Sequence, residues 1–136
     1  MEYLDFIGRD KALFYSDIAT KEDSLKNRVN ESRILVIGGA GTIGQAVSRE
    51  IFKRDSKALH VVDISENNIV ELVRDLRSTV GYGSGEFKTF AVDCGSVEFE
   101  ALVKDQGPND YVFCMSAVMN FRIKKYHFTL MSMIMV

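Results

Sequence analysis

The sequence predicts an α/β fold in which one parallel β-sheet is covered by helices on both faces. From residue 33 onward, apolar runs of strand length alternate with segments of helical periodicity. The connections between these segments are short, which implies parallel strands joined by right-handed crossovers. The strand segments are apolar along their length, as strands covered on both faces are. We therefore expect about four strands in the order 3-2-1-4, which is half of a doubly wound sheet.

Each expected strand is a short apolar run, and each expected helix carries an apolar stripe. The strands are expected at residues 33–37, 58–63, 86–92 and 110–118. In the first helix, helical spacing brings Ile43, Val47 and Ile51 to one face. A serine opens the second helix, and the Gly107-Pro108 pair ends the third. The helices are expected at residues 42–55, 65–80 and 96–106, with a further one beginning in the apolar segment 128–136.

Residues 1–32 differ from the rest of the chain because they are polar and mixed in charge. Thr20 and Asp23 resemble a capping box, which predicts a short helix through residues 21–30. Two interpretations stay open for this segment: helices that pack on a neighbouring subunit, or a loosely attached lead segment. The expected organisation is a helical N-terminal extension, residues 1–32, followed by a domain at residues 33–136.

Composition and charge narrow the classes of function. The chain has 136 residues, enough for one domain with a sizeable core, and its net charge of −2 gives no basic field for nucleic acid. We find no signal peptide and no apolar span long enough for a membrane helix, so a cytoplasmic location is expected. Cys94 and Cys114 have neither metal-ligand spacing nor a disulfide pattern, which favours buried, reduced thiols and no metal site.

A glycine-rich segment, residues 38–44, lies between the first expected strand and the first expected helix. Its sequence GGAGTIG fits GxGxxG from Gly39 and GxxGxxG from Gly38. This strand–loop–helix setting is the one in which a Rossmann-like fold binds a dinucleotide. The structural alternative is a glycine-rich turn that binds nothing.

Each position of this loop has a physical role in such a site. Gly38 or Gly39 permits the tight turn out of the strand, and Gly41 lets the backbone approach a pyrophosphate closely. Gly44 lets the helix lie against the sheet. The amides near Thr42 and Ile43 have no acceptor within the helix, so they are free to bind phosphate oxygens.

An acidic residue after the second expected strand supports the same interpretation. Asp63 lies 19 residues after Gly44, close to the expected separation of about 20. Its carboxylate is expected to accept hydrogen bonds from the adenosine ribose and to repel a 2′-phosphate. This favours NAD over NADP, although Ser65 and Asn67 leave NADP as the alternative.

Four more residues follow strands at the edge where ligands bind in open α/β sheets. Asp93 is a candidate contact for adenine, or else a cap for the following helix, and Cys94 is its neighbour in the candidate site. Ser116 and Ala117 end the fourth expected strand, where small side chains would keep a cofactor groove open. Simple packing explains these two small residues equally well.

Four segments of the sequence carry a resemblance to a known family: residues 38–45, 61–72, 110–118 and 128–136. Over about residues 33–136 the chain resembles the extended short-chain dehydrogenase/reductase superfamily. Within it, the chain is similar to the polysaccharide-biosynthesis branch of the UDP-N-acetylglucosamine 4,6-dehydratase type. The resemblance implies a cytoplasmic enzyme with a tightly held NAD(P) and a UDP-sugar substrate. Such enzymes oxidise the sugar at C4, eliminate water across C5–C6 and return the hydride to C6.

The chain also departs from the pattern that the resemblance implies. Ile37 replaces a usual threonine, and Met119, Asn120 and His127 replace the usual lysine, histidine and proline near the sugar. The family's Tyr-x-x-x-Lys pair is absent, because none of the five tyrosines has a lysine four residues later. No catalytic residue is therefore assigned. Loss of the acid/base contribution alone costs about 10²–10⁴-fold in rate.

The sequence ends in an apolar helical stretch without a stop signal, and the expected fourth strand has no fifth strand beside it. We therefore expect a C-terminally truncated chain that is inactive alone. Three hypotheses follow: the cofactor-binding portion of a dehydratase, a stand-alone dinucleotide-binding module, and a non-catalytic interaction protein. A homo-oligomer or a partner chain is expected to use the N-terminal helices and the exposed strand edge.

Overall fold

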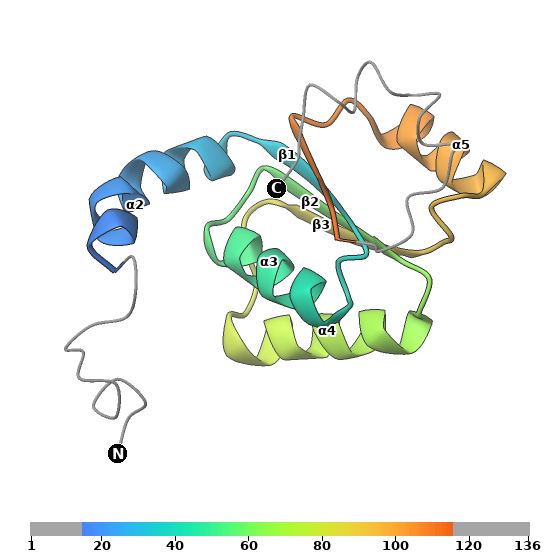
Figure 1. Ribbon diagram of the computed structural model, residues 1–136, viewed down its shortest axis with the longest axis horizontal. Coiled ribbons are helices and arrows are strands. Elements are labelled where there is room, and N and C mark those ends of the chain that lie inside the picture. Colours follow the sequence, from blue (N-terminus) through green and yellow to red (C-terminus); the bar gives the residue numbers. More distant parts are fainter. Residues whose placement is uncertain (1–14, 116–136) are drawn as a thin grey trace.

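A computed structural model describes residues 15–115 of the chain, and it contains one parallel four-stranded sheet (Figure 1). The strand order is β3-β2-β1-β4, as the sequence predicted. β1 and β2 form the centre, and each strand pairs in parallel with its neighbours. The strands are β1 (Arg33–Ile37), β2 (Ala58–Asp63), β3 (Glu86–Ala91) and β4 (Tyr111–Cys114).

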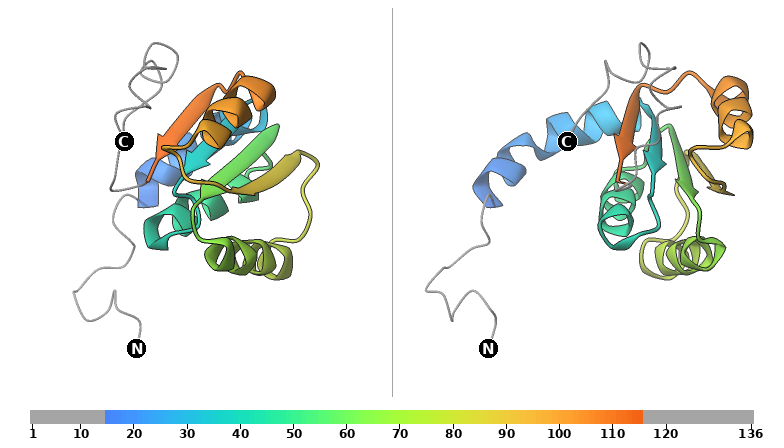
Figure 2. Two further views of the ribbon diagram at one scale, coloured as in Figure 1. Left: turned by 90° about the vertical axis from the view of Figure 1, so that its right-hand side faces the viewer. Right: turned by 45° about the vertical axis from the view of Figure 1, so that its right-hand side comes forward.

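Helices cover both faces of this sheet, so the domain has three layers (Figure 2). α3 (Thr42–Lys53) and α4 (Glu66–Thr79) lie on one face, and α5 (Val97–Gln106) lies on the other. The alternating side chains of β1 divide between two cores: Ile34 and Val36 pack toward α3 and α4, whereas Leu35 and Ile37 pack toward α5. The predicted α/β architecture is therefore confirmed.

Two serines cap helices: Ser65, as the sequence predicted, and Ser96, which was not predicted as a cap. Ser65 Oγ accepts a hydrogen bond from the Asn68 amide at 3.3 Å, and Ser96 Oγ accepts one from the Phe99 amide at 3.2 Å. Each bond satisfies an amide that has no acceptor within its helix. The observed elements are up to a few residues shorter than predicted, since the predicted ends at residues 55, 92 and 110 lie just outside regular structure. The predicted strand residues 116–118 and the predicted helix at 128–136 lie outside the described residues.

The predicted start of the N-terminal helix is wrong. α2 runs from Tyr15 to Asn30, so Thr20 lies inside the helix rather than at its cap. Its hydroxyl donates to the Ser16 carbonyl at 2.7 Å, an internal bond that replaces capping. The capping pattern predicted a boundary too late because residues 15–19 contain no glycine or proline to prevent an earlier start.

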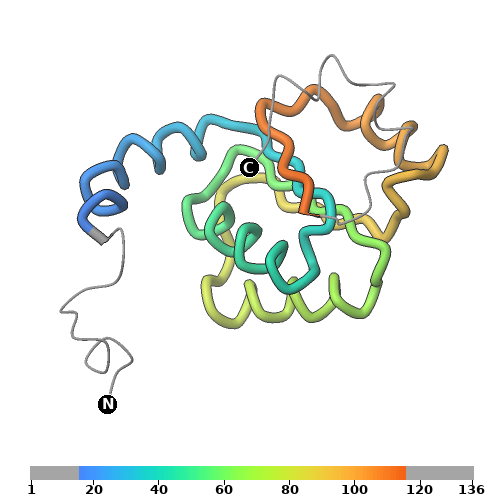
Figure 3. Tube along the Cα trace, in the orientation of Figure 1, coloured from blue at the N-terminus to red at the C-terminus, as the bar shows by residue number. Residues whose placement is uncertain are grey.

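α2 is attached to the domain mainly near its C-terminal end (Figure 3). Val29 is buried in the core beneath α3 and α4, and the Asn30 side chain donates to the Asp55 carbonyl at 2.9 Å. Nearer the middle of α2, the Glu22 carboxylate accepts two hydrogen bonds from the Arg54 guanidinium, from Nε at 3.1 Å and from Nη2 at 3.0 Å. The N-terminal half of α2 extends away from the sheet.

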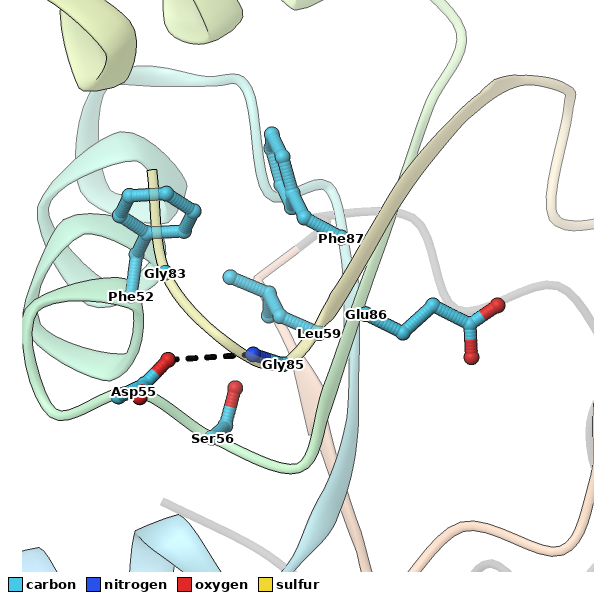
Figure 4. A pocket seen from close by; sticks show the side chains of 8 residues that line it. All are labelled: Phe52, Asp55, Ser56, Leu59, Gly83, Gly85, Glu86 and Phe87. Atoms are coloured by element: carbon cyan, nitrogen blue, oxygen red, sulfur yellow. Dashed lines mark hydrogen bonds between the residues drawn. The ribbon is translucent and has the colours of Figure 1, made fainter. Parts of the chain in front are cut away.

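The end of α3 is joined to the loop before β3 by one carboxylate (Figure 4). Asp55 has a left-handed backbone, with φ of 53°, and accepts hydrogen bonds from the amides of Ser84 and Gly85. The Ser84 hydroxyl also donates to this carboxylate. The hydroxyl bond is the largest cause that lowers the pKa of the Asp55 carboxyl below its ordinary value, and the two amide bonds lower it further. The neighbouring cavity, between Phe52, Phe87 and this loop, has a volume of about 10 Å³, room for a single water molecule. We assign this small cavity and the Asp55 bonds beside it to the structure of the fold rather than to ligand binding.

His60 lies in the centre of β2, only 2% exposed, and its charge state is expected to affect stability. Burial lowers the pKa of the imidazole, Arg33 and Lys88 lower it further, and the Glu86 carboxylate partly opposes them. Between the folded pKa and about 6.5, the unfolded chain binds a proton that the folded chain does not. We therefore predict that the free energy of unfolding falls as the pH drops below about 6.5, by at most about 1.4 kcal/mol per pH unit.

Urea unfolding between pH 5 and pH 7.5 measures this dependence. His60→Gln, which cannot titrate, should flatten the curve in this window. The shifted carboxyls Glu50, Asp55 and Glu86 have pKa values below their ordinary ones, so they titrate at lower pH. An equal slope in the wild-type and His60→Gln proteins would contradict the prediction.

Candidate functional site

The carboxyl ends of the strands border a cleft with a volume of about 470 Å³. The register aligns Ile37 with Val62 and with Cys114, so the loops that follow β1, β2 and β4 begin at the same edge of the sheet. This is the edge at which open α/β sheets bind ligands. The volume lies in the range of small-molecule sites. The described lining residues are Ile37, Gly38, Gly41, Val62, Asp63, Ile64, Val92, Asp93, Cys94 and Met115.

The glycine loop turns sharply out of β1. Gly38 has φ of +74°, a conformation that favours glycine, and the amides of Gly38 and Gly39 both donate to the Val62 carbonyl. A Cβ at Gly39 would lie 2.7 Å from the Val61 side chain, so this position faces the core rather than the cleft. A Cβ at Gly44 would overlap the Gly38 carbonyl and lie 2.7 Å from the Gly39 Cα. Gly44 therefore allows α3 to start directly against the turn.

Gly41 differs from these glycines because nothing in the described fold requires it. Its backbone is extended, with φ of −74°, and a Cβ would lie 3.6 Å from the Gly38 carbonyl oxygen, an ordinary contact distance. Gly41 also lines the cleft. A glycine that the fold does not need, at the mouth of a cleft, leaves room for a ligand to approach the backbone closely.

The N-terminus of α3 faces the same region without a side-chain cap. Gly41 is the N-cap residue and provides no side-chain acceptor, whereas α4 and α5 have Ser65 and Ser96 in that position. The first amides of a helix, here those of Thr42, Ile43 and Gly44, have no acceptor within the helix. The helix dipole adds a partial positive charge of about half a unit. This end of α3 can therefore hold an anion such as a phosphate group.

Asp63 connects the glycine loop to the loop that follows β2. Its carboxylate accepts one hydrogen bond from the Ala40 amide at 3.1 Å and another from the Ser65 amide at 2.9 Å. The residue is 9% exposed and lines the cleft. An ionised carboxylate has about four lone-pair sites, so two remain for a ligand hydroxyl.

Asp93 and Cys94 follow β3 and line the same cleft. Asp93 accepts a hydrogen bond from the Gly95 amide through Oδ1, and its carbonyl accepts one from the Ser96 hydroxyl. The predicted capping role is therefore assigned differently, since Ser96 caps α5 and Asp93 shapes the turn before it. Burial raises the pKa of the Cys94 thiol, and the Asp93 charge raises it further, so the thiol is protonated at neutral pH.

The structure brings most of the candidate residues to one place. Gly38, Gly41, Asp63, Asp93 and Cys94 line the cleft, and Thr42, Ile43 and Gly44 begin the helix beside it. Gly39 and Ser65 have structural contacts instead. The candidates Ser116 and Ala117, and the departures at residues 119, 120 and 127, lie outside the described residues.

Sequence reasoning did not single out several apolar residues that line the cleft, of which Ile64 is the most exposed. Ile64 is 75% exposed, which is unusual for an isoleucine beside a buried strand. Its position directly after Asp63 was the available signal. Within residues 15–115, no three histidine, cysteine or acidic side chains gather as metal ligands would. The helices of this same part of the chain are also too short or too polar to span a bilayer.

Comparison with known proteins gives a family match. Residues 34–124, about two thirds of the chain, match the family model described as "Polysaccharide biosynthesis protein". The chain is also 35% identical, over 54 residues, to the "Uncharacterized membrane protein MJ1061" of Methanocaldococcus jannaschii. That alignment covers 40% of this chain and 16% of the relative.

Solved structures agree with the fold. Pen from Bacillus thuringiensis superposes with a TM-score of 0.54 at 22% identity, covering 73% of this chain and 29% of Pen. PlmKR1, a ketoreductase from the first module of phoslactomycin biosynthesis in Streptomyces sp. HK803, gives 0.50 at 19% identity. That match covers 66% of this chain and 22% of the ketoreductase. The chain thus spans less than a third of the length of these proteins.

Proposed function

The chain belongs to the polysaccharide biosynthesis protein family, and from this premise we propose that it supplies the NAD(P)-binding portion of a nucleotide-sugar 4,6-dehydratase or epimerase. The family match agrees with the predicted resemblance to the polysaccharide-biosynthesis branch of the extended short-chain dehydrogenase/reductases. The cofactor would accept and return a hydride when bound. The UDP-sugar substrate, the dehydratase chemistry and the cytoplasmic location are parts of the same proposal and rest on that resemblance.

The observation that carries the proposal is the glycine at position 41. Gly38 and Gly44 are explained by the turn and by the start of α3, but Gly41 has no such internal reason. A pyrophosphate against the uncapped amides of Thr42 and Ile43 would supply one, because a side chain at position 41 would occupy the space of the phosphate.

The remaining residues of the cleft fit the adenosine side of a dinucleotide. The free lone pairs of Asp63 would accept hydrogen bonds from the ribose hydroxyls, and the same charge would repel a 2′-phosphate. The apolar side chains of Ile64 and Val92 would contact the adenine ring, with the Asp93 side chain near its edge. The proposed ligand is therefore NAD, with NADP bound more weakly.

Isothermal titration calorimetry of the 136-residue protein with NAD⁺ and with NADP⁺ tests the proposal. We expect saturable binding of one NAD⁺ per chain and a weaker signal with NADP⁺. No binding of either cofactor would reject the proposal and leave the non-catalytic interaction protein as the remaining hypothesis.

The role of Asp63 in cofactor choice can be separated from its structural role. Asp63→Ala removes the acceptor for the Ala40 and Ser65 amides, so we expect weaker binding of both cofactors. The ratio of the two dissociation constants cancels this shared defect. We predict that the ratio moves toward NADP⁺ by about tenfold, about 1.4 kcal/mol, because the repulsive charge is gone. An unchanged ratio would show that Asp63 does not select the cofactor.

A further inference from the structure

An exposed stripe runs along α2 from its first turn to its last, with two aliphatic side chains among polar and charged ones. Ile18 is 54% exposed and Leu25 is 43% exposed, although both are large aliphatic side chains. They border a surface hollow of about 370 Å³, whose described lining comes from α2 alone. The described lining residues are Asp17, Ile18, Lys21, Ser24, Leu25 and Arg28. We call this set the α2 stripe.

The α2 stripe continues a face that the domain already buries. At about 100° per residue, Ile18, Leu25 and Val29 lie within about 40° of one another around the helix. Val29 is buried in the domain core, whereas α2 extends away from the sheet toward its N-terminus and takes the stripe with it. The same apolar face is thus covered by the domain at one end and exposed at the other.

The charges at the two ends of the stripe are opposite, so each end is complementary to the other end of a second copy. Asp17 lies in the first turn of α2 and Arg28 in the last turn. They are 11 residues apart, about three turns or 16 Å, so they share one face of the helix. If a second helix of the same sequence lies antiparallel to the first, each Asp17 meets the Arg28 of the other copy. In that register Ile18 of each copy lies about two residues, or about 3 Å along the axis, from the level of Leu25 of the other copy, close enough for the two side chains to pack.

We propose that the α2 stripe is a self-association surface, in which two copies of this chain pair antiparallel through α2. Such a contact is isologous, because the same patch serves both partners. The stripe has an acid and an isoleucine at one end and a leucine and an arginine at the other, so two ion pairs form only in the antiparallel arrangement. Lys21 and Ser24 lie between them and are expected to keep their polar ends in water. A parallel pair would place like charges together at both ends.

One helix pair buries less surface than a standard interface, so the association is expected to be weak and concentration-dependent. Sedimentation equilibrium of the 136-residue protein over a wide concentration range measures it. We expect a monomer–dimer equilibrium with a dissociation constant in the micromolar range. A monomer at all concentrations would overturn the proposal.

Charge reversal tests the antiparallel geometry itself. Asp17→Arg and Arg28→Asp alone should each raise the dimer dissociation constant about tenfold, since two favourable pairs become two repulsive pairs. The double variant Asp17→Arg/Arg28→Asp should restore dimerisation, although it reverses both charges with respect to the helix dipole. A merely structural effect of these residues on α2 would not be rescued in this way.

Asp23→Arg is the matched control, because it makes the same charge change on the opposite side of α2 and should leave the equilibrium unchanged. Replacing both Ile18 and Leu25 by serine should abolish the dimer, with the circular dichroism spectrum confirming that the domain is folded. A dimer that is insensitive to the single charge reversals would show that copies associate through another surface, such as the edge of β4, and would overturn the proposal. These outcomes are independent of cofactor binding.

Discussion

Gly41→Val is expected to abolish binding of NAD⁺ while leaving the domain folded. The first atom of the new side chain fits, because a Cβ at this position lies 3.6 Å from the Gly38 carbonyl oxygen. Valine also accepts the extended backbone of residue 41. Its two methyl groups would project at the uncapped end of α3, where the pyrophosphate is proposed to bind. We expect a loss of at least about 100-fold in affinity, about 2.8 kcal/mol.

Gly41→Ala provides a graded comparison, since it adds the Cβ alone and should weaken NAD⁺ binding less than valine does. Calorimetry measures affinity for each variant, and urea unfolding shows whether stability is preserved. Full affinity in a folded Gly41→Val protein would remove the main support for the proposed function.

Gly44→Ala is expected to have the largest effect on stability. The new Cβ would overlap the Gly38 carbonyl oxygen and lie 2.7 Å from the Gly39 Cα. Both neighbours are backbone atoms of a tight turn, and this turn is held by bonds to the Val62 carbonyl. The overlap cannot be relieved by rotating a side chain, so α3 or the turn must move. We predict a destabilisation of about 3 kcal/mol or more, at the upper end for overpacking.

Urea unfolding at neutral pH measures this effect, and Gly41→Ala serves as the control because it adds the same methyl group three residues earlier in ordinary contact. The two variants should thus differ in kind: Gly44→Ala lowers the free energy of unfolding, and Gly41→Ala lowers the affinity for NAD⁺. Similar stability of the two variants would contradict the different roles that we assign to these glycines.

Much of the fold could be predicted because strong local patterns agree with the tertiary structure. The apolar run at residues 33–37 becomes the central strand β1, and the Ser65 signal becomes the cap of α4. The ends of other elements depend on neighbours that the local sequence does not reveal. Thr20 and Asp23 have the spacing of a cap, but the helix extends past them to Tyr15. A local pattern marks where a helix can begin, not where an earlier start is prevented.

The candidate site could be predicted in its position more than in its contacts. Spacing predicted that Asp63 lies at the carboxyl edge of the sheet, where the structure has it. It did not reveal that the carboxylate already accepts hydrogen bonds from the Ala40 and Ser65 amides. The Ala40 bond joins segments that are 23 residues apart in the sequence, and the Ser65 bond spans only two residues. Likewise, the exposure of Ile64 depends on how the loop after β2 leaves the sheet. Contacts of this kind follow from the arrangement of the loops, which no single segment encodes.

The two hydrogen bonds of Asp63 have a consequence for how a ligand would be received. Through the Asp63 carboxylate at the end of β2, they hold the glycine loop and the first turn after β2 in place before anything binds. Ordering a backbone residue costs about 1–2 kcal/mol, and here that cost is met during folding. The site is therefore preorganised: association should proceed with little rearrangement of the backbone, and affinity should depend on fit rather than on loop closure.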